Sequence, residues 1–170
     1  MKIIGIVLCI LSTSTIGIYY AGRVYERFKI LRQIEDMVIL LKNEIEYTKD
    51  EISEAFYYIS KKTKGCISDM LMELSDKTKE NNGILEEIWA ESVRKHLNDT
   101  CLEDKDIKEL SSLGKNMGYL GMDMQKVNFT KYISYLSDEI KDTKENMDKT
   151  ARFYKMMGIM SGIGISILLI

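Results

Sequence analysis

The chain has 170 residues, of which 45% are hydrophobic and 29% are charged, and its formal net charge is -2 at pH 7. Charges of both signs are mixed along its polar part with no basic patch interleaved with aromatic residues, which argues against a nucleic-acid partner. Its three cysteines form no C-x-x-C pair, and the absence of proline together with many Glu, Lys and Asp residues favours helix throughout.

The first long stretch, residues 3–22, contains no acidic or basic residue. About twenty residues at ~1.5 Å each match the ~30 Å hydrocarbon core of a bilayer, so the stretch is predicted to be a transmembrane helix. A cleaved signal peptide, the alternative, would have a shorter apolar region and an A-x-A-like end. Tyr19 and Tyr20 stand where an interfacial aromatic belt is expected. The basic residues that follow, Arg23, Arg27, Lys29 and Arg32, place this end on the cytoplasmic side.

The polar part, residues 23–155, shows apolar residues at helical spacing. A first stripe consists of Val24, Leu31, Ile34, Val38, Leu41 and Ile45. Further helices are expected near residues 53–60, 67–74, 84–97 and 107–125, with turns at residues 61–65 and at Asn82-Gly83. The last helix begins near Phe129 and continues into the C-terminal segment. Its stripe is expected to pair antiparallel with the first one, with Val24 opposite Tyr154, or to face other helices of a compact bundle.

The C-terminal segment, residues 156–170, is again free of charge and follows Lys149, Arg152 and Lys155. At ~1.5 Å per residue it is short for a crossing, but flanking basic side chains can snorkel and the bilayer can thin, which favours a second span over a peripheral tail. The predicted fold is therefore all-α, a cytoplasmic bundle of five to six helices (23–155) between transmembrane helices 1–22 and 156–170. Both termini lie on the opposite side of the membrane.

Small residues recur every four positions in both predicted spans. They are Gly5, Cys9, Thr13, Gly17 and Ala21 in the first span, and Gly158, Gly162 and Ser166 in the second. Such stripes allow close helix approach in lipid, so the spans are expected to pack, within one chain or between chains. In the cytoplasmic part, Trp89 is expected in the core, or else at an interface. Gly114, Gly118 and Gly121 indicate close helix packing or a groove for a partner.

Catalysis is not expected. His96 is the single histidine and sits beside Arg94 and Lys95, as a solvated histidine would, while Glu44 and Glu46 point to different helix faces. No P-loop, G-x-S-x-G or H-E-x-x-H motif occurs. The sequence therefore predicts no catalytic residue, cofactor, metal site or small-molecule substrate.

Several short motifs occur in a characteristic order between the two spans. The first motif is L-x-x-E-I-x-Y, formed by Leu41, Glu44, Ile45 and Tyr47. The second is IWAES at residues 88–92, and the third is LGKNMG at residues 113–118, followed by Gln125. The fourth is YKMMG at residues 154–158. This order resembles the stage III sporulation protein AB family over essentially the whole chain. Departures are Gly121, where the family's acidic residue is expected, and Met117 and Met157 in place of leucine. The first departure puts a polar contact at that site in doubt.

The resemblance implies a component of the channel complex that links mother cell and forespore in endospore formation. The family's head is similar to the cytoplasmic domains of the inner-membrane platform protein of type II secretion and type IV pilus systems. By that analogy it would dock a secretion-type ATPase, the stage III sporulation protein AA, alongside other channel components, and copies of the chain could associate. The alternative is a membrane-anchored helical signalling or regulatory adapter. A pore built from the spans is disfavoured because neither carries an ionisable residue.

Overall fold

The computed structural model describes residues 2–47, 51–80, 83–117 and 122–168. Within its helices, the side chains of residues 2–7, 9, 10, 47, 116, 122–125, 166 and 168 lie outside this description. The described ranges form six α-helices and one 3-10 helix and contain no strand. This result confirms the predicted all-α class.

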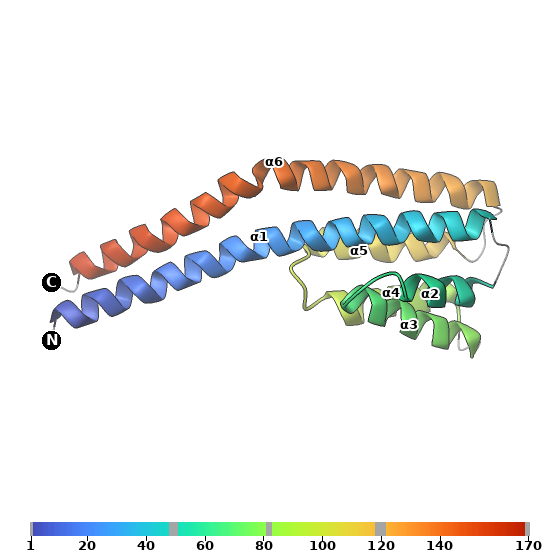
Figure 1. The fold of residues 1–170 in the computed structure, drawn as a ribbon, viewed down its shortest axis with the longest axis horizontal. Helices are drawn as coiled ribbons and strands as arrows, with labels where there is room; N and C mark the ends of the chain where they lie inside the picture. The colour runs from blue at the N-terminus through green and yellow to red at the C-terminus, as the bar shows by residue number, and fades with distance from the viewer. Residues whose placement is uncertain (1, 48–50, 81–82, 118–121, 169–170) are drawn as a thin grey trace. The chain divides into compact units, whose positions relative to one another are not determined.

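Two very long helices begin and end the chain (Figure 1). The helices are α1 (Lys2–Tyr47), α2 (Ile52–Ser60), α3 (Cys66–Lys79), α4 (Leu85–Leu97), α5 (Asp104–Leu113), the 3-10 helix η1 (Gly114–Asn116) and α6 (Met122–Leu168). The chain contains no proline, which would remove a backbone hydrogen bond inside a helix, and α1 and α6 run for 46 and 47 residues. Each predicted span therefore continues into a helix of the polar part without a break.

The chain divides into two compact units. Unit 1 comprises Met1–Lys29 and Ile140–Ile170, and unit 2 comprises Ile30–Glu139. The predicted division at residues 22 and 155 rests on a different criterion, the expected edge of a bilayer. The two divisions therefore do not test each other, and the predicted domain boundaries stay a prediction.

Unit 2 packs helices that follow each other in sequence. Hydrogen bonds join successive pairs: Ser75 Oγ donates to the Ser53 carbonyl at 2.8 Å between α3 and α2, and Lys105 Nζ contacts Glu139 Oε1 at 2.6 Å between α5 and α6. The predicted first stripe supplies core residues, since Leu31, Ile34, Val38 and Leu41 are buried. The core is completed by Met37, Phe56, Ile59, Ile67, Met70, Leu71, Leu74, Trp89, Val93, Leu97, Leu110, Phe129 and Leu136.

Helix ends in unit 2 follow local chemistry. Gly65 has a φ of 64°, a left-handed conformation that suits glycine, at the predicted turn between α2 and α3. Asp106 accepts a hydrogen bond from the backbone N–H of Glu103 at 2.9 Å and so closes the start of α5. The prediction of one helix over residues 107–125 is wrong, because α5 ends at Leu113, η1 follows, and α6 begins at Met122. Gly114 and Gly118 within that range are poor helix formers, which favours an early end.

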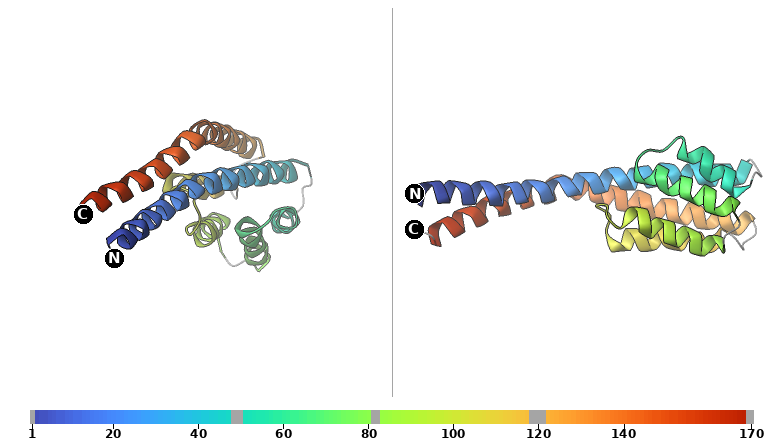
Figure 2. Two further views of the ribbon diagram at one scale, coloured as in Figure 1. Left: turned by 60° about the vertical axis from the view of Figure 1, so that its left-hand side comes forward. Right: turned by 90° about the horizontal axis from the view of Figure 1, so that it is seen from below.

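In unit 1 the two long helices lie side by side, with the start of α1 near the end of α6 (Figure 2). Within the part of the chain that the structure describes, no helix is both long enough and apolar enough to cross a membrane. The two spans predicted over residues 3–22 and 156–170 are thus not confirmed and stay a prediction. Both segments extend into residues whose side chains lie outside the description.

Candidate interaction sites

In unit 1 the two long helices cross at a pair of glycines. The Cα atoms of Gly17 and Gly158 lie so close that a Cβ added to Gly17 would be 2.6 Å from the Tyr154 carbonyl oxygen and 3.2 Å from the Gly158 Cα. A Cβ on Gly158 would be 2.7 Å from the carbonyl oxygen of Thr13. All these neighbours are backbone atoms, which cannot rotate away. Only glycine at both positions permits this approach.

The crossing brings together part of the predicted small-residue stripe. Thr13, Gly17 and Gly158 meet there, and Gly162 is buried one turn further along α6. Ala21 and Ala151, at 1% and 2% exposure, continue the contact toward the polar part of the chain. Gly5, Cys9 and Ser166 lie outside the residues whose surroundings the structure describes.

Polar and aromatic contacts set the register of this pair. The rings of Tyr20 and Tyr154 stack with centroids 5.7 Å apart, so Tyr154 pairs one helical turn away from the expected Val24. Next along the pair, Tyr25 Oη donates to Asp148 Oδ1 at 3.0 Å, and this bond raises the pKa of Tyr25. A heptad stripe cannot select this register, because sliding one helix by a turn preserves the apolar pattern. The glycine crossing and the specific side-chain contacts select it.

Trp89 lies in the core of unit 2, against Gly114. The indole is fully buried, its Nε1 donates to the Leu110 carbonyl at 2.8 Å, and the Phe56 ring centroid is 6.0 Å away. A Cβ on Gly114 would lie 2.5 Å from Trp89 Cδ1 and 2.8 Å from its Cβ. The φ of Gly114 is -61°, so glycine is needed there for space and not for backbone conformation. Trp89 is therefore no exposed anchor, and Gly118 and Gly121 lie outside the described residues.

A charged cluster that sequence reasoning missed joins α3 and α4. Glu73 Oε2 lies 2.6 Å from His96 Nε2 and 2.8 Å from Lys95 Nζ, and Glu73 Oε1 lies 2.9 Å from Lys77 Nζ. Partial burial alone would raise the pKa of Glu73, but the hydrogen bonds from Lys95, Lys77 and His96 outweigh it and lower the pKa to about 2. The expectation of a freely solvated His96 is wrong, because its side chain is only 19% exposed. No local pattern marks this pair, since the partners are 23 residues apart.

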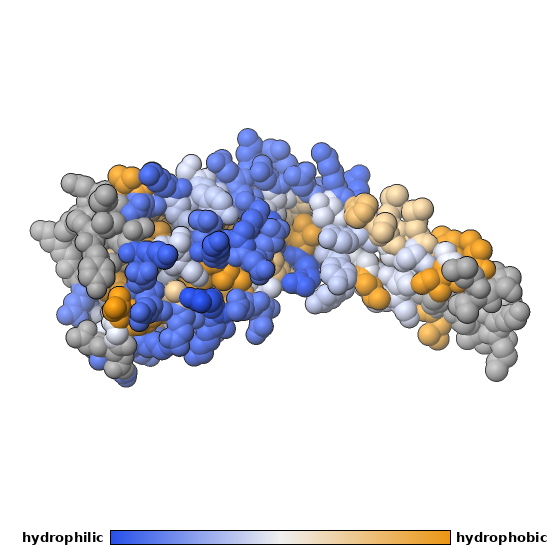
Figure 3. All heavy atoms as spheres, turned by 180° about the vertical axis from the view of Figure 1, so that it is seen from behind, coloured by the Kyte–Doolittle hydropathy of each residue, from blue (hydrophilic) through white to orange (hydrophobic). Residues whose placement is uncertain are grey.

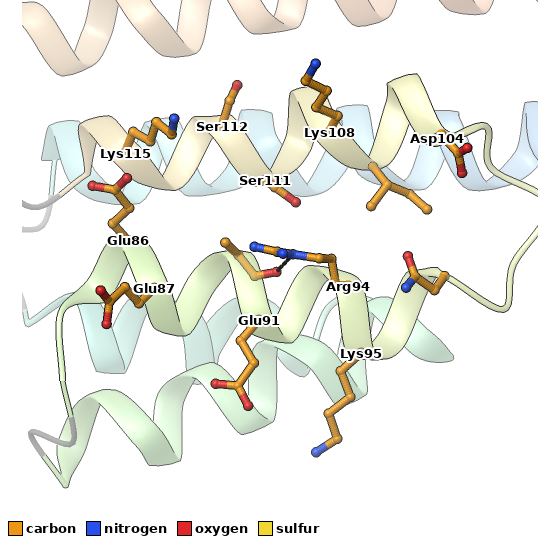
Figure 4. Close-up of a pocket in the computed structure, with 13 residues that line it drawn as sticks. Glu86, Glu87, Glu91, Arg94, Lys95, Asp104, Lys108, Ser111, Ser112 and Lys115 are labelled. Atoms are coloured by element: carbon orange, nitrogen blue, oxygen red, sulfur yellow. Dashed lines mark hydrogen bonds between the residues drawn. The ribbon is translucent and has the colours of Figure 1, made fainter.

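A cleft of about 970 Å³ lies between α4 and α5 in unit 2 (Figure 4). Its lining includes the apolar side chains of Ala90 and Ile107 together with charged side chains from both helices. The Arg94 guanidinium lies between the two helices, where its Nε donates to the Ala90 carbonyl at 3.1 Å. In the described part of the chain, no group of three or more His, Cys, Asp and Glu residues could hold a metal ion. The cleft is thus lined mainly by polar and charged side chains, with few apolar ones.

Comparison with known proteins bears on the whole chain. The family model for stage III sporulation protein AB matches residues 2–170. The chain belongs to the stage III sporulation protein AB family. Stage III sporulation protein AB of Bacillus subtilis (strain 168) is 21% identical over 169 residues, covering 99% of this chain and 99% of that protein.

A solved structure of a stage III sporulation protein AB is similar in fold. Its TM-score is 0.67 at 20% sequence identity, over 72% of this chain and 96% of that chain. At this identity the match shows the shared fold alone. The resemblance noted from the motif order is confirmed, and the chain is a sporulation protein of this family. No family with a catalytic description is among these matches.

Proposed function

We propose that this member of the stage III sporulation protein AB family is a non-enzymatic membrane platform of the channel between mother cell and forespore. Residues 1–22 and 156–170 form its two membrane helices, and residues 23–155 form a head in the mother-cell cytoplasm. The head docks a secretion-type ATPase resembling stage III sporulation protein AA. Other channel components and further copies of the chain complete the assembly.

The exposed apolar surface of unit 1 carries this proposal. Among the side chains of unit 1 that the structure describes, sixteen large hydrophobic ones are exposed, including Leu11 at 64%, Ile18 at 58% and Met160 at 62%. On the face that Figure 3 shows, hydrophobic residues gather over the described part of this unit, whereas hydrophilic residues predominate over unit 2. Soluble proteins rarely expose contiguous apolar patches beyond a few hundred Å². A lipid environment removes this surface from water.

The glycine crossing supports two adjacent membrane helices in particular. In lipid the hydrophobic effect does not bring helices together. Van der Waals contact between closely packed backbones, which small residues permit, stabilises the helix pair instead. Gly17 and Gly158 provide this approach inside the two predicted spans. Basic residues flank both spans on the side of unit 2, at Arg23 and Arg27 and again at Arg152 and Lys155. The positive-inside rule then places the head in the cytoplasm.

Membrane insertion and topology are tested in intact cells that express the full-length chain. The chain is expected to stay with the membrane after alkaline carbonate washing. A cysteine introduced by Lys2→Cys should react with an impermeant maleimide from outside, and one introduced by Lys64→Cys should react only after permeabilisation. The background carries serine at the natural cysteines Cys9, Cys66 and Cys101. Release by carbonate, or the reverse labelling pattern, would refute the anchoring.

ATPase docking is tested separately. The detergent-solubilised chain, tagged at its N-terminus, is mixed with the purified ATPase, and the complex is sized by light scattering. We expect co-purification with a fixed stoichiometry, and no ATPase on resin that carries an unrelated two-span protein. A monomeric chain that binds no ATPase, although the ATPase is folded, would instead favour a membrane-anchored regulatory adapter. ATP hydrolysis by the chain alone would contradict the non-enzymatic assignment.

A further inference from the structure

A smaller pocket, with a volume of about 350 Å³, lies between α5 and α6 inside unit 2. Its lining includes Glu109 from α5 and Asn128, Lys131, Tyr132 and Tyr135 from α6. The four residues of α6 lie on one helix face, because positions three and four apart are neighbours on a helix. Pockets that hold whole small-molecule ligands have volumes of about 300–1,000 Å³, so this Tyr132 pocket suits a single side chain or a ligand of similar size.

Tyr132 brings a buried hydroxyl group to the pocket. Only 8% of its surface is exposed, although it lines the pocket. Within the part of the chain that the structure describes, the hydroxyl has no hydrogen-bond partner. Buried tyrosine hydroxyls usually have such a partner. A polar group that enters the pocket would therefore find an unused hydrogen-bonding group there.

The Tyr132 hydroxyl lies in the field of nearby carboxylates. Burial raises the pKa of Tyr132, and the carboxylates of Asp106 and Glu109 raise it further. Asp106 is already used in closing the start of α5, and the neighbouring Glu139 Oε1 lies 2.6 Å from Lys105 Nζ. Among the described residues, Glu109 by contrast has no ion-pair partner. Its carboxylate is therefore available to a cation in the pocket.

Aromatic rings complete the pocket. The rings of Tyr132 and Tyr135 stack with their centroids 6.0 Å apart and their planes at 30°. Cations are attracted to the faces of such rings, and the planar guanidinium group of arginine also stacks flat on them. Asn128 adds an amide oxygen that can accept a hydrogen bond. The pocket thus combines carboxylate, hydroxyl and amide acceptors with aromatic rings, and this combination suits a guanidinium group.

We propose that the Tyr132 pocket binds an arginine side chain presented by a protein partner. The guanidinium pairs with the Glu109 carboxylate, donates a hydrogen bond to the Tyr132 hydroxyl oxygen and stacks against the Tyr135 ring. Arginine has five N–H donors in one plane, so it can serve several acceptors at once, whereas the lysine ammonium is a compact charge without a plane to stack. The proposal concerns unit 2 alone and depends on neither the membrane helices nor the ATPase.

A positive charge in the lining opposes this ligand. Lys131 also lines the pocket, is exposed, and has no ion-pair partner among the described residues. Because like charges repel, Lys131 is expected to weaken the binding of a cation, whereas it would strengthen the binding of an anion. Removal of its charge therefore distinguishes the two kinds of ligand by the sign of the effect.

The test is a titration of the full-length chain in mild detergent with the peptide acetyl-Gly-Arg-Gly-amide. Binding is followed by NMR of isotope-labelled tyrosine rings, and the Tyr132→Phe and Tyr135→Phe variants identify the two relevant signals among ten tyrosines. Peptides with citrulline, the neutral isostere of arginine, or with lysine serve as matched probes. Free arginine separates a site for a side chain from a site for a small molecule.

The arginine peptide is expected to shift the signals of Tyr132 and Tyr135 together, along one saturable curve. The citrulline peptide should bind at least about tenfold more weakly, because hydrogen bonds between charged groups are stronger than those of a neutral donor. The lysine peptide should bind more weakly by about threefold or more, because it cannot stack. Free arginine should bind no more tightly than the peptide, since only the side chain enters the pocket.

Charge variants locate the binding. Glu109→Gln should weaken binding of the arginine peptide at least about tenfold, because the ion pair is lost. Lys131→Gln should strengthen it by about twofold, because a repelling charge is removed. The controls Glu54→Gln and Lys61→Gln remove exposed charges that do not line the pocket, and they should leave the affinity unchanged. Equal Trp89 fluorescence would show that all four variants are folded.

Several results would overturn the proposal. Absence of a saturable shift at Tyr132 and Tyr135 with millimolar arginine peptide would leave the pocket to water. Equal affinity for the arginine peptide and either matched probe, or undiminished affinity in Glu109→Gln, would exclude specific guanidinium pairing. Binding of free arginine about tenfold tighter than that of the peptide would indicate a small-molecule site. Weaker binding in Lys131→Gln would indicate that the pocket prefers an anion.

Discussion

Gly114→Ala is expected to destabilise unit 2 through a single contact. The new Cβ would lie 2.5 Å from Trp89 Cδ1, whereas carbon atoms prefer about 3.5–4.0 Å. The indole cannot move aside freely, because it is fully buried and its Nε1 donates to the Leu110 carbonyl at 2.8 Å. Overpacking of a core costs about 1–3 kcal/mol, and the overlap here is severe enough for the upper end.

The same substitution carries a compensating gain. Alanine is favoured over glycine in a helix by at most about 1 kcal/mol, and the φ of -61° at Gly114 suits alanine. The net loss in the free energy of unfolding is therefore about 2 kcal/mol. For a chain of this size it corresponds to a melting temperature lower by about 4–8 °C.

The assay is urea unfolding of the full-length chain in mild detergent. The fluorescence of Trp89, the single tryptophan, reports on the site itself. The matched control is Gly22→Ala, a helical glycine with no atom within 4 Å of its added Cβ, which should leave stability unchanged or raise it slightly. A Gly114→Ala variant as stable as the wild type would show that the Trp89 contact does not constrain this position.

Three further substitutions test other contacts. Gly158→Ala should push α1 and α6 apart, since its Cβ would lie 2.7 Å from the Thr13 carbonyl oxygen, and should therefore reduce disulfide formation between cysteines introduced at Tyr20 and Tyr154. The control Gly164→Ala, whose Cβ would have no neighbour within 4 Å, should leave the disulfide yield unchanged. Equal disulfide yields in the two variants would refute the close crossing. The lowered pKa of Glu73 predicts stability that is present above the unfolded pKa near 4.5 and is lost as pH falls through about 2. Glu73→Gln should lower the free energy of unfolding by about 1–2 kcal/mol at neutral pH, after allowance for solvent screening, and should weaken the dependence of stability on pH between about 4.5 and 2. Unfolding measured over this pH range tests both effects. An unchanged pH profile, or the same change in the exposed control Glu109→Gln, would contradict the prediction. Ser75→Ala should cost about 1 kcal/mol in urea unfolding, because a buried hydrogen bond between α3 and the Ser53 carbonyl of α2 is lost. Ser112→Ala, which loses a bond on an exposed helix face, should cost much less.

The sequence was sufficient for the properties that depend on local composition. The absence of proline and the apolar stripes predicted long, uninterrupted helices, and α1 and α6 have that form. The turn over residues 61–65 was also predicted, because glycine and polar residues mark it within a few positions of chain. Residues near each other in sequence decide these features, so one chain without relatives is enough to reveal them. The order of its short motifs was likewise enough to suggest its family.

The tertiary structure alone decided which side chains meet. The register that pairs Tyr154 with Tyr20 follows from the close backbone approach at Gly17 and Gly158, and a heptad stripe is indifferent to a shift of one turn. The cluster of Glu73 with His96 and the fit of Gly114 against Trp89 join residues more than twenty positions apart. Composition and periodicity carry no information on such pairs, because contact across helices depends on the packing of the whole core.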